Sequence, residues 1–145
     1  MLYEKSCGFV AYTEKKNVRL YLVIRALNGD YGFPKGHTED GETEYETARR
    51  ELKEETGAEV EIIEGFRCEA EYPLPRRNNV MKRSVYFLGR CKEDILTPQE
   101  SEVSEARFVP FDEALELLTF EDTKRILKEA NAYIDVITSA ERCVK

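Results

Sequence analysis

The chain has 145 residues, 35% of them charged and 41% hydrophobic, and carries a formal net charge of −7. This length suits one domain with its own core, and the composition excludes a disordered or membrane-embedded chain. The acidic balance excludes general binding to nucleic acid polymers, which depends on neutralising phosphates with Lys and Arg.

Two strands and a loop are predicted first along the chain. Residues 3–13 and 18–27 are rich in β-branched and aromatic side chains, which is typical of strands, and the polar turn 14–17 joins them. An Asn-Gly pair and a proline mark residues 27–36 as a loop.

A helix is predicted over residues 43–56. Thr43 and Glu46 have the spacing of a capping box at its start, and Gly57 follows as a stop signal.

The second half begins with a long strand over 58–72, bent at Gly65. Two further strands are predicted at 80–91 and 106–111. Two helices are predicted at 111–118 and 120–137, and the second of them is amphipathic. Strands with segregated helices predict an α/β sandwich of the α+β class, built on a mixed sheet.

The expected compartment and the expected redox state of the cysteines follow from membrane spans, signal peptides and cysteine pairs that the sequence does not show. No apolar run reaches the roughly 18 residues of a membrane span, and the first ten residues do not resemble a signal peptide. The cysteines Cys7, Cys68, Cys91 and Cys143 are scattered without a CxxC pair. We therefore expect a cytoplasmic protein with reduced thiols, Cys143 being a free surface thiol.

One stretch is basic although the chain as a whole is acidic. Residues 76–83, "RRNNVMKR", hold four positive charges and no acid. They are either a solvated turn or a local site for a small polyanion.

The predicted helix places Glu51, Glu54 and Glu55 at i, i+3 and i+4, on one face. Glutamates on a helix are usually only solvated. Here, however, Arg50 is expected to sit beside the cluster rather than at the spacing that would pair it with these acids. The preceding "GFPKGH" also lets the backbone approach a ligand closely. Oxygen ligands at this density favour Mg²⁺ or Mn²⁺.

This stretch resembles the Nudix box, G-x5-E-x7-R-E-U-x-E-E-x-G-U, where U is a bulky aliphatic residue. The fixed positions are occupied by Gly36, Glu42, Arg50, Glu51, Leu52, Glu54, Glu55, Gly57 and Ala58. Ala58 is smaller than the usual residue, and this departure leaves the acidic positions untouched.

The resemblance implies a Nudix-type α/β/α sandwich over residues 1–145 that cleaves a nucleoside diphosphate linked to another group. It implies that Arg50 holds Glu42 and orients the loop. It also implies that three carboxylates and one carbonyl bind Mg²⁺ or Mn²⁺: Glu51, Glu54, Glu55 and Gly36.

A glutamate is expected to take the proton of the attacking water. The resemblance leaves three candidates, Glu54 and Glu55 in the box and Glu102 on a loop facing it. Glu105 competes with Glu102 for the last position.

The flanking segments resemble the asymmetrical diadenosine tetraphosphate hydrolases of the animal and archaeal type, over nearly the whole chain. That resemblance implies water attack at a terminal-side phosphorus, giving ATP and AMP. It implies polyphosphate contacts and base stacking by Lys35, His37, Lys82, Tyr72 and Phe120. Each has a structural alternative: Tyr72 and Phe120 could pack on a loop or a helix, and His37 could bond a carbonyl.

Other interpretations stay open on the sequence alone. Diphosphoinositol polyphosphate hydrolases share the box, and the basic loop suits a phosphorylated ring; oxidised dGTP or ADP-ribose are further candidate substrates. A non-catalytic nucleotide sensor is the alternative of another class. The sequence does not distinguish a monomer from a dimer.

Overall fold

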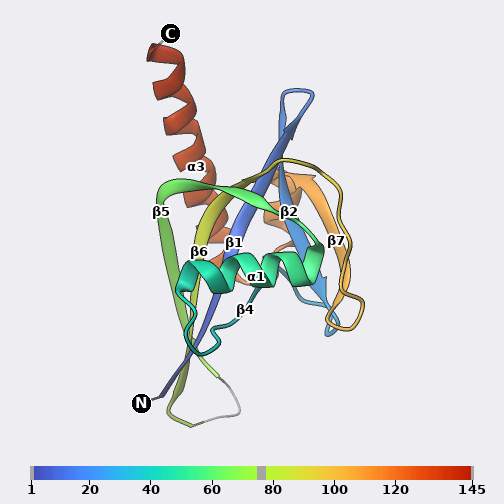
Figure 1. The fold of residues 1–145 in the computed structure, drawn as a ribbon, viewed down its shortest axis with the longest axis vertical. Coiled ribbons are helices and arrows are strands. Elements are labelled where there is room, and N and C mark those ends of the chain that lie inside the picture. Colours follow the sequence, from blue (N-terminus) through green and yellow to red (C-terminus); the bar gives the residue numbers. More distant parts are fainter. Residues whose placement is uncertain (1, 75–77, 145) are drawn as a thin grey trace.

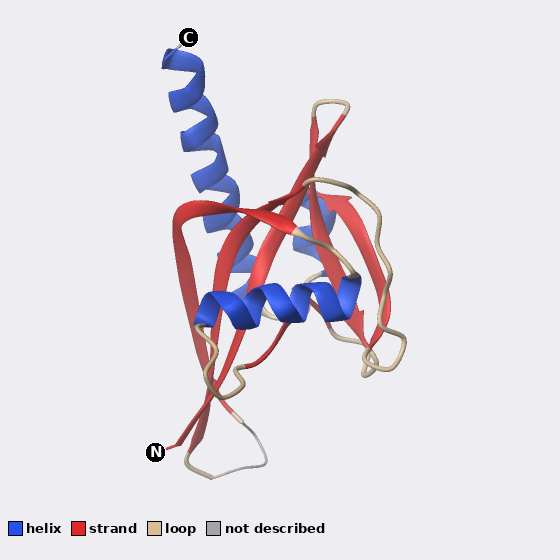
Figure 2. Cartoon of the chain, viewed as in Figure 1, coloured by secondary structure: helices blue, strands red, loops and turns tan. Residues whose placement is uncertain are grey.

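The computed structural model describes residues 2–74 and 78–144 as one mixed sheet with helices on both faces (Figures 1 and 2). Helix α1 (Glu44–Thr56) crosses one face, and α2 (Phe111–Leu117) and α3 (Glu121–Val144) lie on the other. The strands are β1 (Leu2–Lys15), β2 (Val18–Ala26), β3 (Tyr31–Gly32), β4 (Lys35–His37), β5 (Val60–Pro73), β6 (Val80–Cys91) and β7 (Val103–Pro110). The predicted sandwich is confirmed.

The strand order is β3-β2-β1-β6-β5, with β4 paired to β1 and β7 to β2. Strands β1 and β6 run parallel from Leu2↔Val80 to Tyr12↔Arg90, and the other pairings are antiparallel. This places the start of β6 beside the start of β1, where β4 also pairs.

Alternation along β1 divides the core into two layers. Phe9 and Ala11 pack toward α1, whereas Val10 and Tyr12 pack toward α2 and α3. Each layer is completed by the apolar stripe of the helices that cover it.

The prediction of one loop over 27–36 is wrong in part, because it contains β3 and β4. Ile24 pairs with Gly32, and Ser6 to Gly8 pair with β4. Gly8 permits the approach, since a Cβ there would stand 2.2 Å from the Pro34 carbonyl oxygen. Such short strands depend on distant partners and have no local signature.

Other boundaries differ less. The bend at Gly65 is confirmed: its φ is 91°, and the β5–β6 register shifts between Ile62 and Arg67. Strand β7 begins at Val103, before the predicted 106, and α3 runs on to Val144.

The thiols of Cys7, Cys68 and Cys91 are free, as predicted; Cys68 is half-buried and the other two are buried. The prediction for the Cys143 side chain lies outside the described residues. Within the described part of the chain, no helix has the length and hydropathy to cross a bilayer.

Candidate active site

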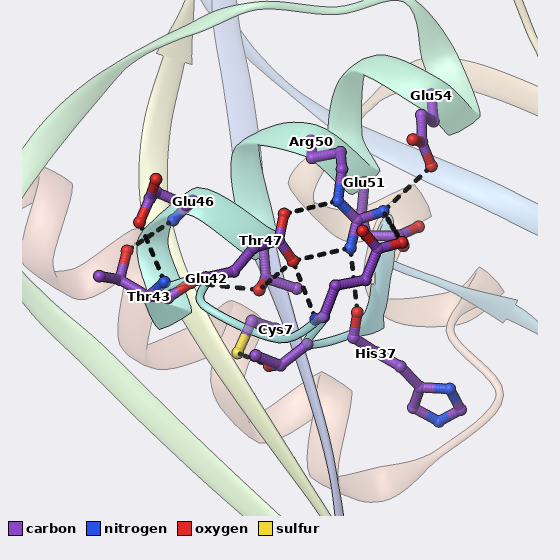
Figure 3. A network of polar contacts seen from close by, with 11 residues as sticks. Cys7, His37, Glu42, Thr43, Glu46, Thr47, Arg50, Glu51 and Glu54 are labelled. Carbon is purple, nitrogen blue, oxygen red and sulfur yellow. Dashed lines mark hydrogen bonds and ion pairs between the residues drawn. The ribbon is translucent and has the colours of Figure 1, made fainter.

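Helix α1 is fixed at both ends by its own sequence. The Thr43 hydroxyl accepts from the Glu46 N–H at 3.1 Å, and the Glu46 carboxylate accepts from the Thr43 N–H at 3.0 Å (Figure 3). Gly57 ends the helix in the left-handed conformation. Both predicted ends are confirmed, so local rules set which residues share a face.

Arg50 connects the loop before α1 to its acidic face (Figure 3). Nε and Nη2 donate to Glu42 at 2.7 and 3.0 Å, and Nη2 donates to the His37 carbonyl at 3.0 Å. Nη1 donates to Glu51 at 2.8 Å and to Glu54 at 3.2 Å. Arg50 lies beside the cluster as expected, but the expectation that it lacks the spacing to pair with these acids is wrong, since Glu54 lies at the favourable i+4 position. The Arg50 bonds lower the pKa of Glu42 to about 2.

The three glutamates of the cluster are not equivalent. Glu55 is only 6% exposed, and its Oε2 accepts from the Lys35 backbone N–H at 3.2 Å. The Glu51 side chain is 13% exposed, whereas that of Glu54 is 51% exposed. Glu51 and Glu55 therefore form the inner part of the cluster.

The negative charge of the inner carboxylates is only partly compensated by Arg50 and Lys35. Burial raises the pKa of Glu55 to about 8, and the charges of Glu51 and Glu102 act in the same direction. Burial also raises the pKa of Glu51, against the effect of Arg50. A cation at this point would relieve the repulsion.

Among the described residues, no three His, Cys, Asp or Glu side chains are arranged to hold a metal ion as they stand. The donor chemistry nevertheless fits Mg²⁺ or Mn²⁺, since it consists of oxygens alone. A Cβ on Gly36 would stand 2.0 Å from the Glu51 Cδ, so the Glu51 carboxylate fits here only because residue 36 is glycine. Rotation of the exposed Glu54 away from Arg50 would bring in a further carboxylate.

A cavity of about 340 Å³ adjoins one of the inner carboxylates, Glu55, and Lys35 and Lys82 also line it. The Lys35 Nζ donates to the Ser84 hydroxyl at 3.1 Å and to the Tyr72 hydroxyl at 3.5 Å. Burial lowers the pKa of Lys35 to about 8, and the charge of Lys82 adds to the effect. Positive and negative groups thus face the same space.

The structure places His37 apart from the cavity lining. Its ring points away from the Arg50 network (Figure 3), and its side chain is 65% exposed. The Lys82 Nζ lies 3.1 Å from its Nε2, and burial lowers the pKa of His37. The ring contacts a lysine that lines the cavity, while the backbone carbonyl binds Arg50.

A second cavity, of about 230 Å³, lies between β5, β6 and the start of α3. Tyr72 and Phe120 line both cavities, as does Lys35. Phe120 is 55% exposed, so its ring is not committed to the core. The two aromatic residues predicted to stack on a base are thus brought to one place.

Glu102 and Glu105 differ in surroundings. Glu102 lines the larger cavity, and its charge acts on Glu51 and Glu55. Glu105 forms an ion pair with Arg107, and the Tyr31 hydroxyl donates to it at 3.4 Å. The geometry favours Glu102 as the residue facing the cluster.

Of the described part of the basic stretch, residues 78–83, only Lys82 lines the cavity. Arg83 instead donates to Glu71 at 2.8 Å and lies over the Tyr3 ring at 4.6 Å. Residues 76 and 77 lie outside the described residues.

Sequence reasoning missed Ser84 and Tyr86, which line the smaller cavity. Ser84 is 1% exposed and accepts from Lys35; Tyr86 is equally buried. The signal was available, because Lys82, Ser84 and Tyr86 alternate on one face of β6.

The NUDIX domain model matches residues 3–130. The chain is 31% identical to the asymmetrical bis(5'-nucleosyl)-tetraphosphatase of Sus scrofa and 34% identical to that of Rattus norvegicus, covering 90% of this chain and 95% of each relative. The fold is similar to a Caenorhabditis elegans Ap4A hydrolase crystallised as a binary complex. The TM-score is 0.83 at 22% identity, covering 91% of this chain and 98% of that one.

Proposed function

Because the chain belongs to the Nudix hydrolase family, whose members act on phosphoric anhydride bonds, we propose that it cleaves diadenosine tetraphosphate asymmetrically into ATP and AMP. The observation that carries the proposal is the junction of two cavities at Lys35, Tyr72 and Phe120. Both cavities have aromatic walls, but Glu55, Glu102 and Lys82 line only the larger one, which suits it to phosphates. The smaller one, lined by Tyr72, Tyr86 and Phe120, suits a base. The similarity to asymmetrical tetraphosphatases over 90% of the chain supports this choice.

In the proposed complex, one adenine occupies the smaller cavity and stacks on Tyr72 and Phe120, each stack contributing about 1–3 kcal/mol. Lys35 and Lys82 face the phosphates. Since Lys35 also bonds Ser84 and Tyr72, it links base binding to phosphate placement.

The proposed site uses Mg²⁺ or Mn²⁺ held by Glu51, Glu54, Glu55 and the Gly36 carbonyl. Such an ion neutralises phosphate oxygens and makes water more acidic. Glu102, on the cavity wall, takes one proton of the attacking water on its carboxylate. The water oxygen bonds to the phosphorus next to one adenosine, and the bond from that phosphorus to the remaining triphosphate breaks. AMP thus carries the new oxygen, and ATP leaves.

We place this activity in a single domain, residues 1–145, in the cytoplasm. The free thiols of Cys7, Cys68 and Cys91 suit a reducing compartment.

The proposal is tested by product analysis with Mg²⁺ in ¹⁸O-labelled water, over dinucleoside polyphosphates, nucleoside diphosphate sugars and inositol pyrophosphates. We expect diadenosine tetraphosphate to be the preferred substrate, with label in AMP and none in ATP. Preference for another member of the panel would overturn the substrate assignment. Nucleotide binding without turnover of any member would indicate a sensor.

The variant Tyr72→Ala separates this proposal from inositol pyrophosphate hydrolysis. Loss of a stack should raise KM for diadenosine tetraphosphate about tenfold. Hydrolysis of a substrate without a base should change much less, since Lys35 keeps its shorter bond to Ser84.

A further inference from the structure

Asp122 is one of the residues that line the smaller cavity. Asp122 is the second residue of α3 and is half-buried. Within residues 2–74 and 78–144, no group donates a hydrogen bond to it or forms an ion pair with it. Asp122 lies close enough to act on the hydroxyls of Tyr72 and Tyr86. Burial raises the pKa of both hydroxyls, and the charge of Asp122 raises it further.

A half-buried carboxylate without protein donors takes its hydrogen bonds from water or from a bound ligand. The N-terminus of α3 stabilises part of the Asp122 charge, because negative charge is favourable in the first turn of a helix. That effect explains an acid at this position. It does not explain why the acid faces a cavity walled by Tyr72 and Phe120.

We propose that Asp122 is a specificity-determining residue that accepts a hydrogen bond from the exocyclic amino group of the bound base. This rests on the proposed function, which places adenine in the smaller cavity. Adenine presents a hydrogen-bond donor in its 6-amino group, and a purine with hydrogen at the same ring position lacks that donor. Asp122 thus favours the base that carries the amino group.

The test is calorimetric binding of two nucleotides that differ only in that group: AMP, and purine riboside 5'-monophosphate, which has hydrogen in place of the amino group. Hydrogen bonds to charged groups correspond to roughly a 10- to 100-fold difference in Kd. The unmodified protein should therefore bind AMP tighter by about that factor. Asp122→Ala should bring the ratio close to one. Asp122→Asn keeps the shape and an acceptor oxygen, and should give an intermediate ratio.

The control is Asp112→Ala, at the second residue of α2, which is exposed and outside both cavities. It removes the same charge from the same helical position and should leave the ratio unchanged. If Asp122 served only α3, its variants would lower Tm without changing the ratio.

An unchanged ratio in Asp122→Ala, equal binding of both nucleotides by the unmodified protein, or no binding of AMP would each overturn the inference. Turnover of diadenosine tetraphosphate is measured separately. Turnover of diadenosine tetraphosphate together with equal binding of the two nucleotides would refute the role of Asp122 but not the proposed function. Selective AMP binding without turnover would support the role of Asp122 and refute the proposed function.

Discussion

The Glu51 carboxylate lies against the α-carbon of Gly36, leaving no room for a side chain there: an added Cβ would stand 2.0 Å from Cδ and 2.3 Å from each carboxylate oxygen. Arg50 fixes Glu51 in this position through a bond of 2.8 Å. Residue 36 must therefore be glycine, because the carboxylate of Glu51, fifteen residues later, occupies the space of a side chain.

Gly36→Ala should displace the Glu51 carboxylate and lower kcat/KM. A displacement near 1 Å in a positioned group is associated with losses of about 100-fold. The moving atoms belong to a side-chain end, so Tm should change little. Steady-state kinetics and thermal melts check both parts, and wild-type kcat/KM would contradict the assignment.

The proton-acceptor assignment is tested by Glu102→Gln. Removing a general base should lower kcat by about 100- to 10,000-fold, with little change in Tm, because the side chain is exposed. The matched variant Glu105→Gln alters the acid bonded to Tyr31 and Arg107 and should leave kcat within a few-fold. If Glu105→Gln shows the larger loss, the assignment is reversed.

Divalent metal should stabilise the folded chain independently of substrate. A ligand at 100 times its Kd adds about 2.7 kcal/mol, which corresponds to roughly 10 °C in Tm at this size. We expect Mg²⁺ or Mn²⁺ to raise Tm in the unmodified protein and to have little effect in Glu55→Gln. Because that variant removes a buried charge, its Tm without metal should equal or exceed that of the unmodified protein near pH 8. An equal metal-induced shift in both proteins would remove Glu55 from the ligand set.

Glu44 should make stability depend on pH in the acid range. Arg67 donates to both of its oxygens, at 3.0 and 2.8 Å, and Lys5 forms an ion pair with it. The Arg67 bonds lower the pKa of Glu44 to about 2 in the folded state, against about 4.5 unfolded. Folding therefore gains stability above pH 4.5 and loses it as the pH falls toward 2.

Glu44→Gln should destabilise the protein by about 1 kcal/mol at pH 7, a value typical of partly exposed pairs. The difference should shrink as the pH falls below 4.5 and vanish only below pH 2, as measured by denaturant unfolding. Glu61→Gln, an exposed acid on β5, is the control. A difference between Glu44→Gln and the unmodified protein that is constant with pH would refute the ion-pair account.

Local rules determined much of the candidate site. The capping box, the stop at Gly57 and the helical period fixed which acids share a face. They also held information that sequence reasoning did not use: Glu55 lies three positions after the buried Leu52, which places it on the inner side. These features depend on residues within a few turns, so the sequence alone determines them.

Only the tertiary structure decided which distant groups meet. Lys35 contacts Ser84 from 49 positions away, and the short strand β4 exists because β1 supplies its hydrogen bonds. The choice between Glu102 and Glu105, three positions apart, depends on what each one faces across the sheet. The physical reason is that local bonding fixes the form of each element, whereas the packing of both sheet faces fixes which elements face one another. No pattern of neighbouring residues contains that packing.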